Sequence, residues 1–403
     1  MLTDHARAYL HHLCLELPPR PTGAPGNRAA TDFFAATVAG FGWEVERPAF
    51  DCLDWHTDGA LLLAGAEPFE VFPSPHSPAC QVTAPLRVVE TIEALEAASV
   101  AGDILLLHGA VAREPLMPKR FPFYNPDEHQ RLYRALEAAR PAAVLTASAR
   151  HPEMAGALYP YPMIEDGDFD IPSAYLTAEL GAALAAHAGQ PVTLAIHAER
   201  CAAQACNVVA RRGLATARRV VLMAHIDAKA TTPGAIDNAS GVVTLLLLAE
   251  LLSDYAGALG IEIVAMNGED NYGVPGERLF LEANTSRFDD IVLGINLDGL
   301  GYREGRTAYS CYNCPPSLTA AIESAFAPHP GLAPGEPWYQ GDHGLFLFNN
   351  CPALALTSER AADLMARFVH TPLDTPDLVD PARLTEAAHA LKDLMVRLAS
   401  LLL

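Results

Sequence analysis

The pattern of apolar and polar residues between positions 219 and 252 predicts a buried strand, a polar loop and a buried helix. Val220 to Ala224 are five apolar residues without a break, which is typical of a strand covered on both faces in a parallel sheet. The strand ends at His225-Ile-Asp227, and a Pro-Gly loop leads to Asp237-Asn-Ala-Ser-Gly241. The apolar run from Val242 to Leu252 is too long for one strand and predicts a helix.

The same pattern recurs towards the C-terminus and predicts an α/β fold. Three further apolar runs predict strands: Ile261 to Met266, Ile291 to Leu297 and Ala353 to Leu356. Apolar residues at helical spacing predict a closing helix from Pro381 to Leu402. We therefore expect a mixed sheet with a parallel centre, flanked by helices.

The middle of the chain has a different pattern. Between about residues 56 and 200, short β-like runs alternate with turns rich in proline and glycine, which is typical of a small β-rich domain. Residues 1–55 read as helix, loop, helix and strand, with no chemistry of their own. We expect a catalytic domain formed by residues 1–55 and 201–403, with residues 56–200 inserted into it.

Composition and charge exclude several classes of function. The formal net charge of the 403 residues is −21, which argues against nucleic acids and anionic membrane surfaces as partners. We find no secretory signal and no apolar stretch long enough to span a membrane. Eight scattered cysteines favour a reducing, cytoplasmic compartment. Cys311 and Cys314 form a lone C-x-x-C pair, which we interpret as structural, with a redox role as the minor alternative.

Acidic and histidine side chains follow the predicted strands at the points where these strands end. His225 and Asp227 follow the first strand, Glu269 and Asp270 the second, and Asp298 the third. A single such residue is usually a satisfied polar group, but several at one edge of a sheet are what a metal site needs. Two histidines, including a later one at position 370, together with three carboxylates form a ligand set that suits zinc, manganese or cobalt.

A series of motifs resembles the co-catalytic dizinc aminopeptidases, a family that includes bacterial leucyl aminopeptidases, glutamate carboxypeptidase and glutaminyl cyclase. The motifs occur in the family's order: His225-Ile-Asp227, Gly234 to Gly241, Gly268-Glu269-Asp270, Asn296-Leu-Asp298, Gly341-Asp342-His343 and His370 to Thr375. The resemblance covers the first 55 or so residues and everything after about 206. It implies the zinc-exopeptidase fold, also described as phosphorylase/hydrolase-like. The middle segment resembles, more weakly, the protease-associated domain that many members insert.

Carried over residue by residue, the resemblance implies a role for each motif. His225 and Asp298 would bind one metal, Asp270 and His370 the other, and Asp237 would bridge the two. Asp227 would hold the ring of His225, and Glu269 would be the general base. Two divalent ions, zinc first and cobalt or manganese as alternatives, would be the cofactors. Tyr302, Asp342 and His343 are candidates for substrate contacts, and packing beside the site is the equally weighted alternative.

The sequence departs from the family at two places. Asp270 stands where most members have a second glutamate, which puts metal affinity and metal identity in question. The stretch from Asn271 to Glu277 differs from the Gly-Ser ending of relatives and could reshape the pocket near the metals.

These features favour a metallo-aminopeptidase that acts on peptides with a free N-terminus. A carboxypeptidase or an amidohydrolase on acylated amino acids stays open, because Arg303 and Arg306 could hold a substrate carboxylate. A metal-free, receptor-like relative is the alternative from another class of protein, but every ligand position holds a competent residue. The sequence leaves a homo-oligomer open.

Overall fold

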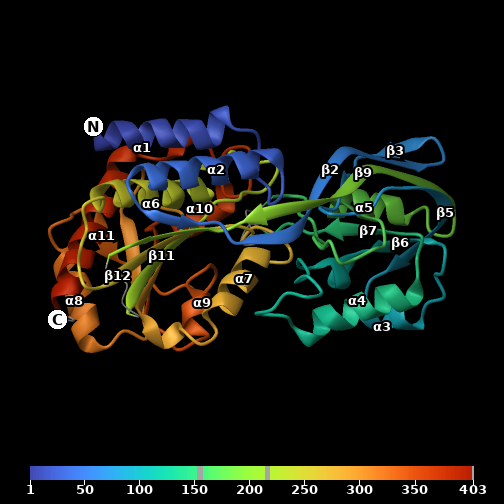
Figure 1. Ribbon diagram of the computed structural model, residues 1–403. Helices are drawn as coiled ribbons and strands as arrows, with labels where there is room; N and C mark the ends of the chain where they lie inside the picture. Colours follow the sequence, from blue (N-terminus) through green and yellow to red (C-terminus); the bar gives the residue numbers. More distant parts are fainter. Residues whose placement is uncertain (152–157, 214–217, 402–403) are drawn as a thin grey trace. The chain divides into compact units, whose positions relative to one another are not determined.

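The computed structural model describes residues 1–151, 158–213 and 218–401. The chain forms two compact units: the large unit, Met1–Cys52 with Gln204–Leu403, and the inserted unit, Leu53–Ala203. Figure 1 shows the elements of both units along the chain. The closing helix was predicted to end at Leu402, which lies outside the described residues. No helix in the described part of the chain is long and apolar enough to cross a membrane.

The large unit contains an eight-stranded mixed sheet in the order β1-β10-β12-β11-β13-β16-β14-β15. The central strands β12, β11, β13 and β16 run parallel to one another. At one side of the sheet, β1 pairs antiparallel with β10 and β10 with β12; at the other, β14 pairs antiparallel with β16 and parallel with β15. The strands are β1 (Glu44–Glu46), β10 (Val208–Arg212), β11 (Arg219–His225), β12 (Gly260–Met266), β13 (Ile291–Leu297), β14 (Thr307–Tyr312), β15 (Leu332–Pro334) and β16 (Ala353–Ser358). This arrangement confirms the expected α/β class with a parallel centre.

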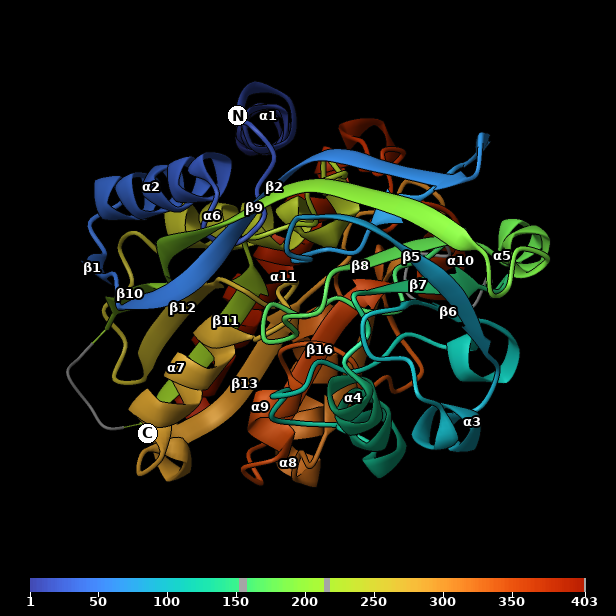
Figure 2. The same ribbon diagram turned by 90° about the vertical axis from the view of Figure 1, so that its right-hand side faces the viewer.

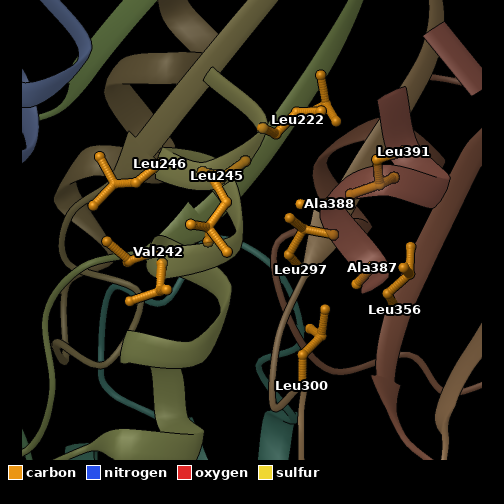
Figure 3. Packing of buried hydrophobic residues seen from close by; sticks show 14 of the residues in the cluster. Leu222, Val242, Leu245, Leu246, Leu297, Leu300, Leu356, Ala387, Ala388 and Leu391 are labelled. Atoms are coloured by element: carbon orange, nitrogen blue, oxygen red, sulfur yellow. The ribbon is translucent and has the colours of Figure 1, made fainter. Parts of the chain in front are cut away.

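Helices cover both faces of this sheet. The helices of the large unit are α1 (Leu2–His11), α2 (Pro25–Gly40), α6 (Ser240–Leu251), α7 (Pro275–Asn284), α8 (Pro316–Phe326), α9 (Gly344–Leu347), α10 (Ala361–Arg367) and α11 (Pro381–Leu401). The helix α6 is apolar on all sides because it is enclosed by α1, α2, α11 and the sheet. Figure 3 shows Leu245 of α6 and Leu391 of α11 in the buried cluster that includes Leu222 and Leu297 of the sheet. On the other face, Phe346 of α9 packs onto Gly294 of β13.

The inserted unit is organised around a second eight-stranded sheet, in the order β3-β2-β9-β5-β6-β7-β8-β4. Its elements are β2 (Ala49–Ala64), β3 (Glu67–Phe69), β4 (Phe72–Pro73), β5 (Cys80–Val89), α3 (Ile92–Ala97), β6 (Ile104–Leu107), α4 (Asp127–Ala139), β7 (Ala143–Ser148), β8 (Ser173–Thr177), α5 (Ala178–Ala185) and β9 (Pro191–Cys206). Alternate residues of β6 belong to two separate apolar clusters. Ile104 and Leu106 pack in one cluster, and Leu105 and Leu107 pack in the other. Figure 2 shows β2 and β9 side by side, as their pairing order requires.

Several strands were not predicted from the sequence, and β14 and β9 are the longest of them. The strand β14 includes Cys311, and β9 is sixteen residues long. Both contain alanine, serine or charged residues, which have low intrinsic preference for strands. Their pairing with neighbouring strands fixes their conformation, and sequence patterns do not reveal that pairing.

Candidate metal centre

The parallel strands of the large unit end at one edge of the sheet, and four of the residues singled out from the sequence lie there. His225 is the last residue of β11, Glu269 and Asp270 follow β12, and Asp298 follows β13 directly. The β11 register aligns His225 with Met266, so the residues after β12 continue beside the histidine. The loop after α10 contributes His370, whose backbone has a φ of +60°.

These side chains converge on Asp237. Nε2 of His225 lies 3.0 Å from Oδ1 of Asp237, and Nε2 of His370 lies 2.9 Å from Oδ2 of the same carboxylate. His225 is also 3.7 Å from Oδ1 of Asp298, and His370 is 3.0 Å from Oδ1 of Asp270. Asp237 therefore stands between two groups of ligand-type atoms, each with one imidazole and one further carboxylate.

The hydrogen bonds of His225 show what its inward-facing nitrogen requires. Nδ1 lies 3.2 Å from the backbone carbonyl of Asp227, and because a carbonyl only accepts, Nδ1 carries the proton. In the neutral ring, the lone pair of Nε2 then faces the oxygens of Asp237 and Asp298. A nitrogen lone pair and two carboxylates facing one another need a cation or a second proton between them.

The electrostatics of the site point the same way. Burial lowers the pKa of His225, but the charge of Glu269 and the hydrogen bond to Asp237 outweigh it and raise the pKa well above its usual value. Burial likewise lowers the pKa of His370, but the Asp270 and Asp237 carboxylates have the larger effect. The pKa of His370 is therefore also well above its usual value. The buried carboxylates therefore create a strong demand for positive charge.

The donor set fits divalent cations. His225, Asp237 and Asp270 each offer one ligand atom, and these atoms all lie within 4.8 Å of one another. Oδ2 of Asp270 is buried without a hydrogen-bond partner among the described residues, so it is available to a cation. Imidazole and carboxylate donors without a thiolate are the set that zinc shares with manganese and cobalt.

Asp237 is held by Asp374, which stands out in the sequence only as part of the motif His370 to Thr375. The turn Ala235–Ala239 (η4) follows Gly234, whose φ is +62°, and places Asp237 towards the strand ends. The carboxylate of Asp374 accepts hydrogen bonds from the backbone N–H groups of Ile236, at 2.7 Å, and Asp237, at 3.0 Å. Asp374 is fully buried, and burial raises its pKa to about 7.

Asp227 differs in detail from the expectation that its carboxylate holds the ring of His225. The ring bonds the backbone carbonyl of Asp227, while Oδ1 of Asp227 is 3.8 Å from Nδ1. The carboxylate instead accepts hydrogen bonds from the N–H groups of Gly268, at 2.8 Å, and Asp270, at 3.1 Å. Asp227 therefore fixes both the histidine and the backbone that carries Asp270.

The loop near residue 20 supports the site, although no chemistry was predicted for this segment. Thr22 donates to the Asp227 carboxylate at 2.9 Å. The guanidinium of Arg20 is buried and donates to four backbone carbonyls, those of Leu13, Ile226, Pro233 and Gly234. Nothing in the local sequence signals these contacts, because their acceptors lie on distant segments.

Glu269 and the three suggested substrate-contact residues occupy different environments. Burial raises the pKa of Glu269 well above its usual value, His225 lowers it, and the Asp270 and Asp342 carboxylates raise it further. Asp342 and His343 are buried, and Nε2 of His343 bonds the Trp338 carbonyl at 2.9 Å. Tyr302 is buried as well, with its ring 6.3 Å from that of Phe368. Direct substrate contact by Tyr302, Asp342 and His343 stays a prediction.

Comparisons with known proteins show what the large unit is similar to. Residues 207–395 match the model described as Peptidase family M28, which confirms the recognition made from the motifs. The probable lipoprotein aminopeptidase LpqL of Mycobacterium tuberculosis is 25% identical over 287 residues, covering 70% of this chain and 55% of the relative. The match thus spans only about half the length of that curated relative.

Solved structures share the fold across nearly the whole chain. The aminopeptidase from Aneurinibacillus sp. strain AM-1 superposes with a TM-score of 0.75 at 21% identity, covering 98% of this chain and 93% of that one. The zinc aminopeptidase BSAP of Bacillus subtilis gives a TM-score of 0.73 at 17% identity, with 98% and 94% covered. At these identities the likeness establishes the fold.

Proposed function

Because residues 207–395 match peptidase family M28, we propose that this protein is a metal-dependent aminopeptidase that hydrolyses the N-terminal residue of peptides. One observation carries the proposal: both imidazoles converge on the carboxylate of Asp237, at 3.0 and 2.9 Å. The related proteins named as aminopeptidases support this activity over others of the same fold.

Five residues would hold two divalent ions. His225 and Asp298 would hold one, His370 and Asp270 the other, and Asp237 would bridge them. Zinc is the ion named for the Bacillus subtilis relative, and cobalt or manganese would suit the same ligands. Two such ions would lower the pKa of a bound water and polarise the scissile carbonyl.

Glu269 is the proposed general base. It would accept a proton from the attacking water and deliver it to the departing amine, so that the peptide bond breaks without a free amide anion. The raised pKa of Glu269, caused first by burial, suits a group that must take up a proton. Asp227 would keep His225 and the backbone of Asp270 in place, and Asp298 would also face the free α-amine of the substrate.

Replacement of Glu269 by glutamine tests the reaction. The amide keeps the shape of the side chain but cannot accept a proton, so we expect kcat on an aminoacyl-nitroanilide to fall by about 10²–10⁴-fold. Elemental analysis should still find two metal ions per chain. Glu282 is exposed on α7, and Glu282→Gln is the matched control that should keep full turnover.

Three results would contradict the proposal. Near-normal turnover in the Glu269→Gln variant would remove the general base from the scheme. A zinc content of one or none per chain would remove the paired site. Activity on N-acetylated but not free-amine peptides would instead indicate an amidohydrolase.

The carboxypeptidase alternative has less support. Its substrate carboxylate would need a free cationic group, but the guanidinium of Arg306 bonds Glu359 at 2.8 Å. Arg303, the other candidate, is exposed, and the relatives named as aminopeptidases favour the aminopeptidase over this role for its side chain.

The remaining features of the chain extend the proposal. We infer that residues 56–200 are a protease-associated domain; the tight turn Ala101-Gly-Asp103 into β6, together with β7 and β8, supports this.

All eight cysteines are free thiols in the described residues, which supports a reducing, cytoplasmic compartment. Peptides with a free N-terminus are the proposed partners, and size measurement in solution would test for a homo-oligomer.

A further inference from the structure

Glu277 is a buried acid that the proposed reaction does not use. It is the third residue of α7, its exposed fraction is 5%, and its Oε2 has no hydrogen-bond partner among the described residues. Glutamate is almost never this buried unless it is paired. It also ends the stretch in which this sequence departs from the Gly-Ser of relatives, so its position needs an explanation specific to this chain.

The start of α7 is held tightly beside the end of β12. Asn207 donates to the Gly276 carbonyl at 2.9 Å, and the backbone is so close that a Cβ on Gly276 would lie 1.9 Å from the Asn267 carbonyl oxygen. Val274, immediately before the helix, has a φ of +37°, which branched residues rarely adopt. These contacts place Glu277 beside the segment that leads into Glu269.

The partner of Glu277 is a second buried acid. Asp342 lies within hydrogen-bonding reach of Glu277, and its exposed fraction is 1%. Neither oxygen of Asp342 receives a hydrogen bond from an N–H or hydroxyl group in the described residues. Two ionised carboxylates in contact would repel each other and leave Oε2 of Glu277 and both oxygens of Asp342 buried without a donor. A single proton removes both problems, because the neutral acid donates to the ionised one.

We propose that Glu277 and Asp342 form a carboxylic acid–carboxylate pair that holds one proton and positions both side chains beside Glu269. Both Glu277 and Asp342 interact electrostatically with Glu269. The positioning role rests on the proposed function, whereas the shared proton does not. Glu277 acts through Asp342 and does not touch the substrate.

The charges around the pair favour keeping the proton. Burial raises the pKa of Glu277 well above its usual value, and the nearby carboxylates raise it further. Burial also raises the pKa of Asp342 to about 6, with the Glu277 hydrogen bond and His225 lowering it. The charged groups that act on one or both acids are Glu269, Asp227, Asp298 and His225. The proton therefore resides mainly on Glu277.

Infrared spectroscopy of the full chain tests the pair without reference to activity. At neutral pH, with and without zinc, the wild-type protein should show a protonated carboxyl C=O band that shifts on ¹³C labelling of glutamate. This band should be absent from the spectrum of the Glu277→Gln variant. If wild type and variant show the same protonated carboxyl bands, Glu277 is ionised and the proposal is wrong.

Thermal melting against pH gives a second test. Because the folded-state pKa of Glu277 lies above its usual 4.5, the proton stabilises the fold fully below that usual value. This stabilisation is lost as pH rises through the folded-state pKa. The wild-type Tm should therefore fall relative to Glu277→Gln as pH rises from about 4.5 towards the folded-state pKa of Glu277. A constant difference in Tm between pH 5 and pH 10 would overturn the shared proton.

Two replacements of Glu277 separate positioning from packing. Glutamine can donate an N–H to Asp342 in place of the acid proton, so kcat should stay within about threefold of wild type. Methionine has similar length but no donor, and kcat should fall by about tenfold or more, while KM and zinc content change by less than about twofold. The control is Glu262→Met, another buried glutamate, paired with Arg211 at 2.8 Å, which should lower Tm but not kcat.

The outcomes distinguish the two proposals. Equal kcat in Glu277→Gln and Glu277→Met would overturn the positioning role. If the wild-type protein fails to cleave free-amine peptides, the proposed function fails, and the infrared and melting results still decide whether the pair exists.

Discussion

At the scale of single residues, the sequence predicted the candidate ligands better than the groups that hold them. His225 and Asp298 directly follow apolar runs, and Asp270 lies four positions after one; the recurrence of this position marks them as candidates. Arg20 carries no such signal, because one of its acceptors, the Ile226 carbonyl, lies 206 positions away. Asp374 was visible only as part of a quoted motif, although it bonds the backbone of Asp237. Contacts of this range depend on the folded chain and not on local pattern.

Arg20 provides a prediction at this scale. In Arg20→Met the stem of the side chain is kept, but four backbone carbonyls lose their donor inside the protein. We expect the free energy of unfolding in urea to fall by about 3 kcal/mol or more. Zinc affinity should also fall, because two of these carbonyls belong to Pro233 and Gly234, which lead into the Asp237 turn.

Arg7 is the matched control for Arg20. Its side chain is exposed on α1, and among the described residues it pairs only with Asp4, at 3.4 Å. Arg7→Met should change the free energy of unfolding by less than about 1 kcal/mol. If both variants unfold at the same urea concentration, the buried hydrogen bonds of Arg20 are not a significant source of stability.

At the scale of elements, hydrophobic pattern predicted the strands that are enclosed on both faces and missed those fixed by pairing. The strands β11 and β13 are almost continuous apolar runs, and each was predicted. The strand β14 has the mixed sequence Thr-Ala-Tyr-Ser-Cys-Tyr, and its pairing with β16 and β15 defines it. The approach of α7 to β12 was equally invisible, since it depends on glycine at one position of close contact.

Gly276 tests that close contact. A Cβ there would meet the backbone oxygen of Asn267 at 1.9 Å, and a backbone atom cannot move aside as a flexible side chain can. We expect Gly276→Ala to lower the free energy of unfolding by about 1–3 kcal/mol. It should also lower kcat, because the shift moves Glu277 away from its partner.

Gly273, three residues earlier, is the control. Its nearest neighbour would be Oδ1 of Asn271 at 3.8 Å, an ordinary contact, and its φ does not require glycine. Gly273→Ala should therefore melt within a few degrees of wild type and keep its turnover. Equal losses in the two variants would show that the loop as a whole, and not the contact at Gly276, is sensitive.

At the scale of the whole molecule, the change of pattern in the middle of the chain indicated an insertion, and the structure divides into units at 52/53 and 203/204. All five proposed metal ligands, Glu269 and the Glu277–Asp342 pair belong to the large unit. The points where the chain leaves and re-enters this unit are adjacent: Gln204 donates to Asp51 at 3.0 Å, and Asn207 donates to the Pro48 carbonyl at 3.1 Å.

This adjacency predicts that the large unit folds without the insertion. A variant that joins Cys52 to Gln204 through a short glycine-containing turn keeps its own apolar core, and roughly 250 residues are enough to bury one. We expect cooperative melting by circular dichroism and two zinc ions per chain. The same variant with Asp237→Ala should fold but lose metal, because the bridging carboxylate is removed. A non-cooperative melt would show that the large unit needs the insertion for its stability, whereas cooperative folding with zinc but without turnover would assign the insertion to the reaction itself.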